Sequence, residues 1–144
     1  KKIYPEFLNN DNDRKNLSNN IKDIFDIIEP EDITRKMNKA YSYVYQLPCH
    51  LRGERNIYER QIKMMSKIEG LQLSFINRTC CGQSGMFGFK KDNYELSMEI
   101  ANENLLKIAN NPALMVVTPC PTCKLRVENF CSKKAKHPLE IVLK

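Results

Sequence analysis

The chain has 144 residues, 42% of them hydrophobic and 28% charged, which are values of an ordinary globular domain with a real core. It holds 23 basic and 17 acidic residues, for a formal net charge of +6. The basic residues are scattered and are not interleaved with aromatic residues on one face, so no nucleic-acid interface is expected. No apolar run reaches the length of a membrane span, so we expect a domain that does not cross a bilayer.

The first half of the chain predicts a helix, a strand and a second helix. Apolar residues recur at helical spacing in residues 13–29, and Pro30 ends this pattern. Residues 41–47 are rich in β-formers and predict a strand. Residues 58–68 again show helical spacing, and we expect Gly70 to close this helix at its C′ position.

The second half continues the alternation of strands and helices. Residues 71–76 predict a strand, residues 94–108 a helix, and the apolar run 113–118 a strand buried on both faces. Pro121 predicts the first turn of another helix, and His137 the start of a short terminal one. Helices between strands imply parallel pairing with right-handed crossovers. We therefore expect an α/β layered domain with a small, mostly parallel sheet and helices on both faces.

The organisation along the chain suggests one domain with an N-terminal extension. We expect residues 1–36 to form a helical segment that leads into a cysteine-rich domain of residues 37–144. The sequence begins at Lys1 without a methionine, which suggests a single domain excised from a longer subunit.

The basic residues gather once, near the end of the chain. The simpler interpretation is a solvated basic surface, and the alternative is that these cations offset the negative charge of bound thiolates. The group comprises Lys124, Arg126, Lys133, Lys134 and Lys136.

Cysteines follow each of the three expected strands. Ligands of open parallel sheets collect beyond the carboxyl ends of the strands, so five sulfurs are expected at one edge of the sheet. No leader is evident and the size needs no disulfide staples, which favours a reducing compartment and a metal or redox role. The sixth, Cys131, lies farther along a helix and is expected to be a buried, inert thiol. The six are Cys49, Cys80, Cys81, Cys120, Cys123 and Cys131.

Three kinds of chemistry compete for these sulfurs. The Cys120–Cys123 pair alone resembles a thioredoxin-type redox motif, but that interpretation leaves three cysteines unexplained. A zinc site would use Cys49, one of the two adjacent cysteines and the Cys120–Cys123 pair, with one thiolate left over. An iron–sulfur cluster accommodates adjacent cysteines because they reach different irons, and five thiolates indicate a cluster of unusual shape.

The loop after the adjacent cysteines is rich in glycine. Gly82, Gly85 and Gly88 would let backbone N–H groups approach the sulfur atoms, or would serve only a tight turn that needs positive φ. We expect Phe87 and Phe89 to cover the site. His50, beside the first cysteine, is expected to play a supporting or packing role and not to be a ligand.

Four motifs together resemble the cysteine-rich CCG domain of heterodisulfide reductase B subunits and glycolate oxidase iron–sulfur subunits. The likeness begins at about Tyr45, and the end of the chain is most similar to the family of C subunits of anaerobic glycerol-3-phosphate dehydrogenases. The motifs are LPCHL at 47–51, CCG at 80–82, FGFK at 87–90 and CPTC at 120–123.

The resemblance implies a site and a setting. The ligands of a 4Fe–4S cluster of noncubane type would be Cys49, Cys80, Cys81, Cys120 and Cys123. Gly82, Gly85, Phe87 and Gly88 would form the surroundings of the cluster. Zinc is the alternative metal, because a related domain has been regarded as a zinc binder.

The implied activity is electron transfer in an oxidoreductase, from a flavin-containing dehydrogenase subunit that oxidises glycerol 3-phosphate toward a membrane or quinone-linked subunit. The implied location is cytoplasmic and peripheral, at the inner face of the cell membrane. The alternatives are a structural zinc module that docks subunits and a catalytic cluster domain of the heterodisulfide reductase type. By itself the domain is not expected to be catalytic.

Overall fold

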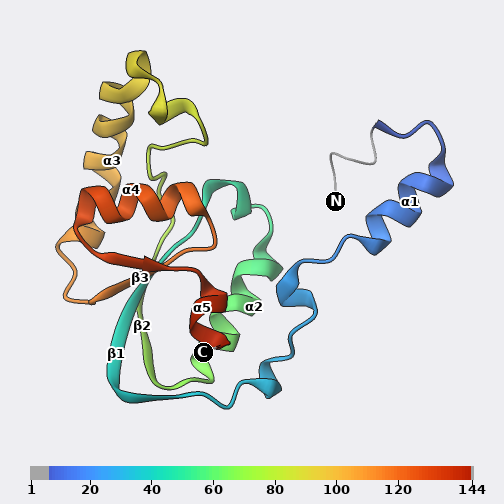
Figure 1. Ribbon diagram of the computed structural model, residues 1–144, viewed down its shortest axis with the longest axis horizontal. Coiled ribbons are helices and arrows are strands. Elements are labelled where there is room, and N and C mark those ends of the chain that lie inside the picture. Colours follow the sequence, from blue (N-terminus) through green and yellow to red (C-terminus); the bar gives the residue numbers. More distant parts are fainter. Residues whose placement is uncertain (1–6, 144) are drawn as a thin grey trace.

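The computed structural model describes residues 7–143, and within them helices alternate with strands (Figure 1). Short 3₁₀ turns connect several of the elements. In chain order the elements are α1 (Asp11–Asn20), β1 (Lys36–Gln46), α2 (Arg55–Ser66), β2 (Glu69–Asn77), α3 (Tyr94–Ala109), β3 (Met115–Val117), α4 (Pro121–Cys131), β4 (Lys134–Lys136) and α5 (Pro138–Val142).

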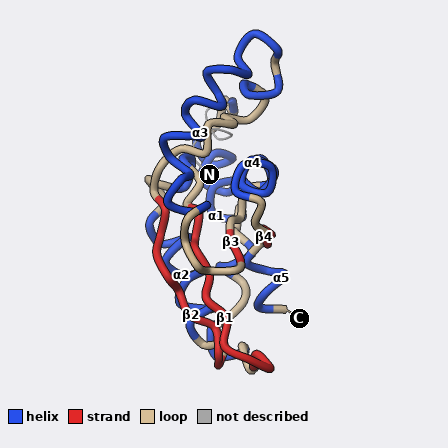
Figure 2. Tube along the Cα trace, turned by 90° about the vertical axis from the view of Figure 1, so that its left-hand side faces the viewer, coloured by secondary structure: helices blue, strands red, loops and turns tan. Residues whose placement is uncertain are grey.

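The strands form one parallel sheet in the order β2-β1-β3-β4. Tyr43 in the inner strand β1 pairs with Leu73 of β2 on one side and with Met115 of β3 on the other. Residues 43–46 are at most 1% exposed, as expected of a strand with neighbours on both sides and helices on both faces. β1 and β2 run side by side, and α3 extends beyond their ends (Figure 2).

The helices cover both faces of the sheet. Tyr43 and Tyr45 pack with buried side chains of α2 and α5, whereas Val44 and Val116 pack with those of α3 and α4. Neighbouring residues of a strand point to opposite faces, so each face of β1 enters a different part of the core. The predicted layered α/β fold is confirmed.

The predicted helix over residues 13–29 is wrong in extent. α1 ends at Asn20, and the chain then leaves the helical conformation. Asp23 starts a separate 3₁₀ turn, Ile24–Asp26, by accepting a hydrogen bond from the N–H of Phe25, and Phe25 is the residue of this turn that enters the core. The apolar spacing therefore reflects two short pieces, of which α1 buries no side chain.

Two smaller predictions also need correction. α2 closes at Lys67, whose N–H bonds to Met64 and Met65, so Gly70 is not its C′ residue. Gly70 lies inside β2, where φ is +83° and a Cβ would lie 3.2 Å from the Cβ of Met37. The short strand β4 was not expected, because a Lys-Ala-Lys segment carries no strand pattern.

The N-terminal helix stands apart from the sheet, as Figure 1 shows. The division of the chain at residue 36 stays a prediction. Among residues 7–143, no helix combines the length and apolar character needed to cross a bilayer.

Candidate metal centre

The cysteine-bearing segments leave the sheet at one edge, as predicted. Cys49 opens a 3₁₀ turn after β1, Cys80 and Cys81 follow β2, and Cys120 is the N-cap of α4, with Cys123 in its first turn. β1 lies between β2 and β3 in the sheet. The chain passes from β1 to β2 on one side and then to β3 on the other side of β1, so β1 and β3 flank a switch point of the topology. Such a switch point is where open α/β sheets place their ligands.

Three of the sulfurs lie together. The Sγ atoms of Cys81 and Cys123 are 3.2 Å apart, and both residues are 4% exposed. Cys120 interacts with the Cys123 thiol, and its Sγ lies 3.2 Å from the Oγ1 of Thr122. Segments that follow two different strands therefore meet through direct sulfur contacts.

The shared hydrogen bonds set which thiols ionise. Donation by the Cys123 thiol lowers the pKa of Cys120 to about 4, assisted by the Thr122 hydroxyl and by backbone N–H groups at the start of α4. The close contact with the Cys123 sulfur lowers the pKa of Cys81 to about 7, and the contacts with Cys120 and Cys81 raise the pKa of Cys123 itself. Thiolate is the form that binds metals, so Cys120 is prepared for ligation.

The other two predicted ligands lie at the margin of this group. The Sγ of Cys80 accepts a hydrogen bond of 3.4 Å from the N–H of Gly82. Burial is the main cause that raises the pKa of Cys80, and the nearby Cys81 and Cys49 thiols add to it. Cys49 is exposed. Within residues 7–143, no three His, Cys, Asp or Glu side chains have the geometry to hold a single ion as they stand.

The five cysteines nevertheless fit zinc or an iron–sulfur cluster by their chemistry. The donor set consists of five cysteine sulfurs, of which two are buried, two are half-buried and one is exposed, and one of them has a strongly lowered pKa. Soft thiolate sets bind zinc and iron–sulfur clusters in preference to hard cations.

The three glycines of the loop have different roles. Gly82 and Gly85 have φ of +81° and +60°, so both adopt the left-handed conformation expected of a tight turn. Gly88 does not, and the positive-φ interpretation is wrong for it. A Cβ on Gly88 would lie 2.3 Å from the Oγ of Ser97, so this position requires a small residue because of packing.

The remaining predictions have mixed outcomes. Phe89 is 54% exposed and Phe87 is half-buried, and their role as a cover of the site stays a prediction. Cys131 is confirmed as a buried thiol, and burial raises its pKa to about 11. His137 is confirmed as the residue that starts α5. His50 is exposed, which excludes a packing role.

Sequence reasoning missed a buried polar group behind the cysteine loop. It consists of Gln83, Ser97 and Arg126, all at most 6% exposed. The interpretation of the terminal basic group as solvated is wrong for Arg126. A signal existed, because Arg126 follows Cys123 by three positions in a helix and therefore shares its face.

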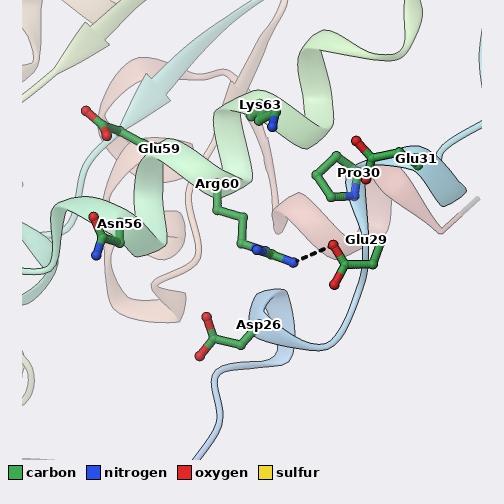
Figure 3. A pocket seen from close by; sticks show the side chains of 8 residues that line it. All are labelled: Asp26, Glu29, Pro30, Glu31, Asn56, Glu59, Arg60 and Lys63. Atoms are coloured by element: carbon green, nitrogen blue, oxygen red, sulfur yellow. Dashed lines mark hydrogen bonds and ion pairs between the residues drawn. The ribbon is translucent and has the colours of Figure 1, made fainter.

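A pocket of about 360 Å³ lies elsewhere, between α2 and the segment that precedes β1 (Figure 3). It contains no cysteine. Arg60 on α2 reaches Glu29 at 3.1 Å across it, so this contact ties the N-terminal segment to the domain. The pocket is not part of the candidate metal centre.

Comparison with known proteins finds relatives that are dehydrogenases or oxidase subunits. The chain is 32% identical over 149 aligned residues to the C subunit of anaerobic glycerol-3-phosphate dehydrogenase from Escherichia coli K12, and the match covers 96% of this chain and 35% of that protein. It is 26% identical over 86 residues to a probable glycolate oxidase iron–sulfur subunit of Bacillus subtilis (58% and 19% covered). It is 28% identical over 114 residues to D-2-hydroxyglutarate dehydrogenase of Pseudomonas putida (78% and 11% covered).

The chain thus spans about a third or less of the length of these relatives. No solved structure matches it. The family model of the cysteine-rich domain named CCG matches residues 43–128, which contain β1 from Tyr43 onward, β2, β3 and all five clustered or marginal cysteines of the site. The chain therefore belongs to the CCG cysteine-rich domain family.

Proposed function

We propose that this chain is an electron-transfer domain of an oxidoreductase and that its cysteines hold a 4Fe–4S cluster of noncubane type. The observation that carries the proposal is the meeting of the Cys81, Cys120 and Cys123 sulfurs at the switch point of the sheet. The bound cluster would supply one-electron redox chemistry. The proposed ligands are Cys49, Cys80, Cys81, Cys120 and Cys123.

The protein residues have separate tasks in this proposal. Cys81 and Cys123 are 4% exposed and keep water from one side of the site. The N–H of Gly82 donates to the Cys80 sulfur, and such bonds stabilise negative charge on sulfur. The pocket between α2 and the segment before β1 contains no cysteine, so it gives no substrate site beside the proposed cluster. In this proposal electrons enter and leave through partner subunits.

The relatives support the proposed setting. They are a glycerol-3-phosphate dehydrogenase subunit, a glycolate oxidase subunit and a hydroxyglutarate dehydrogenase. We propose a flavin-containing dehydrogenase subunit as the electron donor and a membrane or quinone-linked subunit as the acceptor, with glycerol 3-phosphate as the substrate of the whole complex. The domain would work in the cytoplasm, at the inner face of the membrane.

The test is the composition of protein prepared and reconstituted without oxygen. The proposal predicts iron and acid-labile sulfide at about four each per chain, with a brown colour. One zinc without sulfide would contradict it and would favour a structural zinc module.

Two cysteine substitutions make the test specific. Cys81→Ser removes a sulfur that contacts Cys123 and is expected to weaken cluster retention by at least tenfold, the scale of lost metal-site contacts. Cys131→Ser is the matched control, because this buried thiol bonds to the Leu105 carbonyl, at 3.8 Å, and its replacement should leave the iron content unchanged. Equal iron content in both variants would remove Cys81 from the ligand set.

A further inference from the structure

Arg126 is a buried cation without an opposite charge beside it. It is 6% exposed, and no carboxylate of residues 7–143 lies within ion-pair distance of it. Its guanidinium donates to the Ser97 Oγ at 2.6 Å and to the Met98 sulfur, and it lies 6.0 Å from the Tyr94 ring centroid. All three partners are neutral, and a buried charge is costly unless it is matched.

Arg60 shows how another arginine of the molecule is paired with a carboxylate. The Nε atoms of both arginines are buried without a hydrogen-bond partner. The Nη2 of Arg60, however, reaches the Glu29 carboxylate at 3.1 Å (Figure 3). Arg126 has no such neighbour among residues 7–143.

A chain of hydrogen bonds links Arg126 to the cysteine loop. Its Nη2 donates to the Ser97 Oγ, and the Ser97 hydroxyl donates to the carbonyl of Gly82 at 2.7 Å. The N–H of Gly82 donates in turn to the Cys80 sulfur. Arg126 also shares the buried face of α4 with Cys123. Arg126 is therefore linked through Ser97 to the loop that carries Cys80, and it lies in the same helix as Cys123.

Gly88 packs closely against the group formed by Gln83, Ser97 and Arg126. A single Cβ on Gly88 would lie 2.3 Å from the Ser97 Oγ and 3.1 Å from both the Arg126 Nη2 and the Gln83 Nε2. Gln83 is 4% exposed, and its Nε2 has no partner among the described residues. A side chain at Gly88 would collide with the Ser97 hydroxyl. The hydrogen bonds that start at Arg126 lead through Ser97 and Gly82 to the Cys80 sulfur.

We propose that Arg126 is a positioning residue that balances the negative charge of the cysteine-held centre and fixes the loop through Ser97. This inference rests on the proposed function. A reduced cluster carries one more negative charge than an oxidised one, so a buried cation favours reduction. Loss of the cation should make the cluster harder to reduce.

The experiment compares reduction potentials of reconstituted Arg126→Gln, Arg126→Lys and Lys124→Gln. Arg126→Gln is expected to favour the oxidised form at least tenfold, which is about 59 mV toward negative potential for one electron. Arg126→Lys keeps the charge and should restore most of the wild-type value. Lys124→Gln removes the same charge next to Cys123, but Lys124 is 36% exposed and pairs with Glu140, so solvent screens it and the potential should barely change.

A second measurement separates charge balance from simple packing. In metal-free protein, Arg126→Gln should leave the urea midpoint unchanged or raise it, because an unmatched buried charge is removed. In reconstituted protein it should lower the midpoint. Loss of iron uptake by a folded Arg126→Gln variant, with normal uptake by Arg126→Lys, would also support the proposal.

Each opposite result has a distinct meaning. A wild-type potential in Arg126→Gln, or equal losses of midpoint in the metal-free and reconstituted forms, would overturn the role of Arg126 alone. Wild-type protein that takes up no iron and sulfide would overturn the proposed function and this inference with it.

Discussion

Gly82 and Gly85 have the same left-handed backbone but different surroundings. A Cβ on Gly82 would lie 2.3 Å from the carbonyl oxygen of Ser97, whereas nothing lies within 4 Å of a Cβ on Gly85. The cost of a side chain at Gly85 is therefore conformational only, and at Gly82 a steric clash with α3 adds to it. The contact at Gly82 holds the cysteine loop against the first turns of α3.

Alanine substitutions measure this difference. Gly85→Ala should lower the free energy of unfolding by about 1–2 kcal/mol, the cost of a left-handed residue with a side chain. Gly82→Ala should lower it by about 3 kcal/mol or more, because the Ser97 backbone must also move. Urea denaturation gives both values. Gly53→Ala is the neutral control, since this glycine has an ordinary φ and open space around it. Equal losses at Gly82 and Gly85 would refute the close packing.

At the residue scale, the sequence predicts the positions of the cysteines better than the burial of the residues that pack behind them. The positions of Cys80, Cys120 and their neighbours follow from where strands end, which apolar patterns reveal. The burial of Arg126 does not follow, because an arginine on a helix has the same sequence signature whether solvent or a neighbouring helix faces it. Only the packing of α3 against α4 decides between the two.

At the element scale, long periodic patterns predict structure well and short ones do not. Helix α3 and strand β2 were predicted within a few residues. The pattern in residues 13–29 failed because spacing cannot distinguish one helix from a helix followed by a capped 3₁₀ turn. β4 escaped prediction because its pairing with β3, and not its composition, makes it a strand.

His137 makes the start of α5 dependent on pH. Its Nδ1 accepts a hydrogen bond of 3.2 Å from the N–H of Leu139, which requires a neutral ring. Burial lowers the pKa of His137, and this outweighs the opposite influence of Glu140 and Asp23. The unfolded chain therefore takes up the proton first as pH falls. The stability contributed by the neutral ring is complete above about pH 6.5 and is lost as pH falls from there toward the folded-state pKa.

The corresponding variant is His137→Asn, which keeps an N-cap acceptor but does not titrate. Thermal or urea midpoints of wild type should fall relative to this variant between pH 8 and pH 5. His137→Ala should be about 1 kcal/mol less stable than His137→Asn at every pH, because the cap itself is removed. Parallel pH profiles of wild type and His137→Asn would show that the ring does not titrate in this range.

At the scale of the whole molecule, the N-terminal helix contributes little to the core. α1 contains no buried residue, whereas Phe25, shortly after it, is 2% exposed and stacks on the His137 ring at 6.2 Å between centroids. The part of the N-terminal segment that enters the hydrophobic core thus begins after α1.

Truncation tests where the independent domain begins. A chain that starts at Ile21 should unfold within about 0.5 kcal/mol of the full chain, as for changes at exposed sites. Phe25→Ala should cost about 3–5 kcal/mol, the range for a large aromatic removed from a core. A large loss on truncation at Ile21 would show that α1 belongs to the folding unit.

The topology of the whole sheet is what makes a site from cysteines far apart in sequence. The order β2-β1-β3-β4 brings the ends of three strands to one edge, and the sulfurs of Cys81 and Cys123, 42 positions apart, come to 3.2 Å. The sequence predicts this convergence through the alternation of strands and helices. It does not predict the sulfur contacts, which depend on the helix start at Cys120 and on the glycine loop.

The most direct test of electron transfer by this domain is a spectroelectrochemical titration of anaerobically reconstituted wild-type protein, followed by visible absorption. A cysteine-held cluster should give a broad sulfur-to-iron absorption band that bleaches and returns reversibly in a one-electron step. A colourless protein whose spectrum does not respond to potential, with its cysteines holding zinc, would contradict electron transfer as the function of this domain.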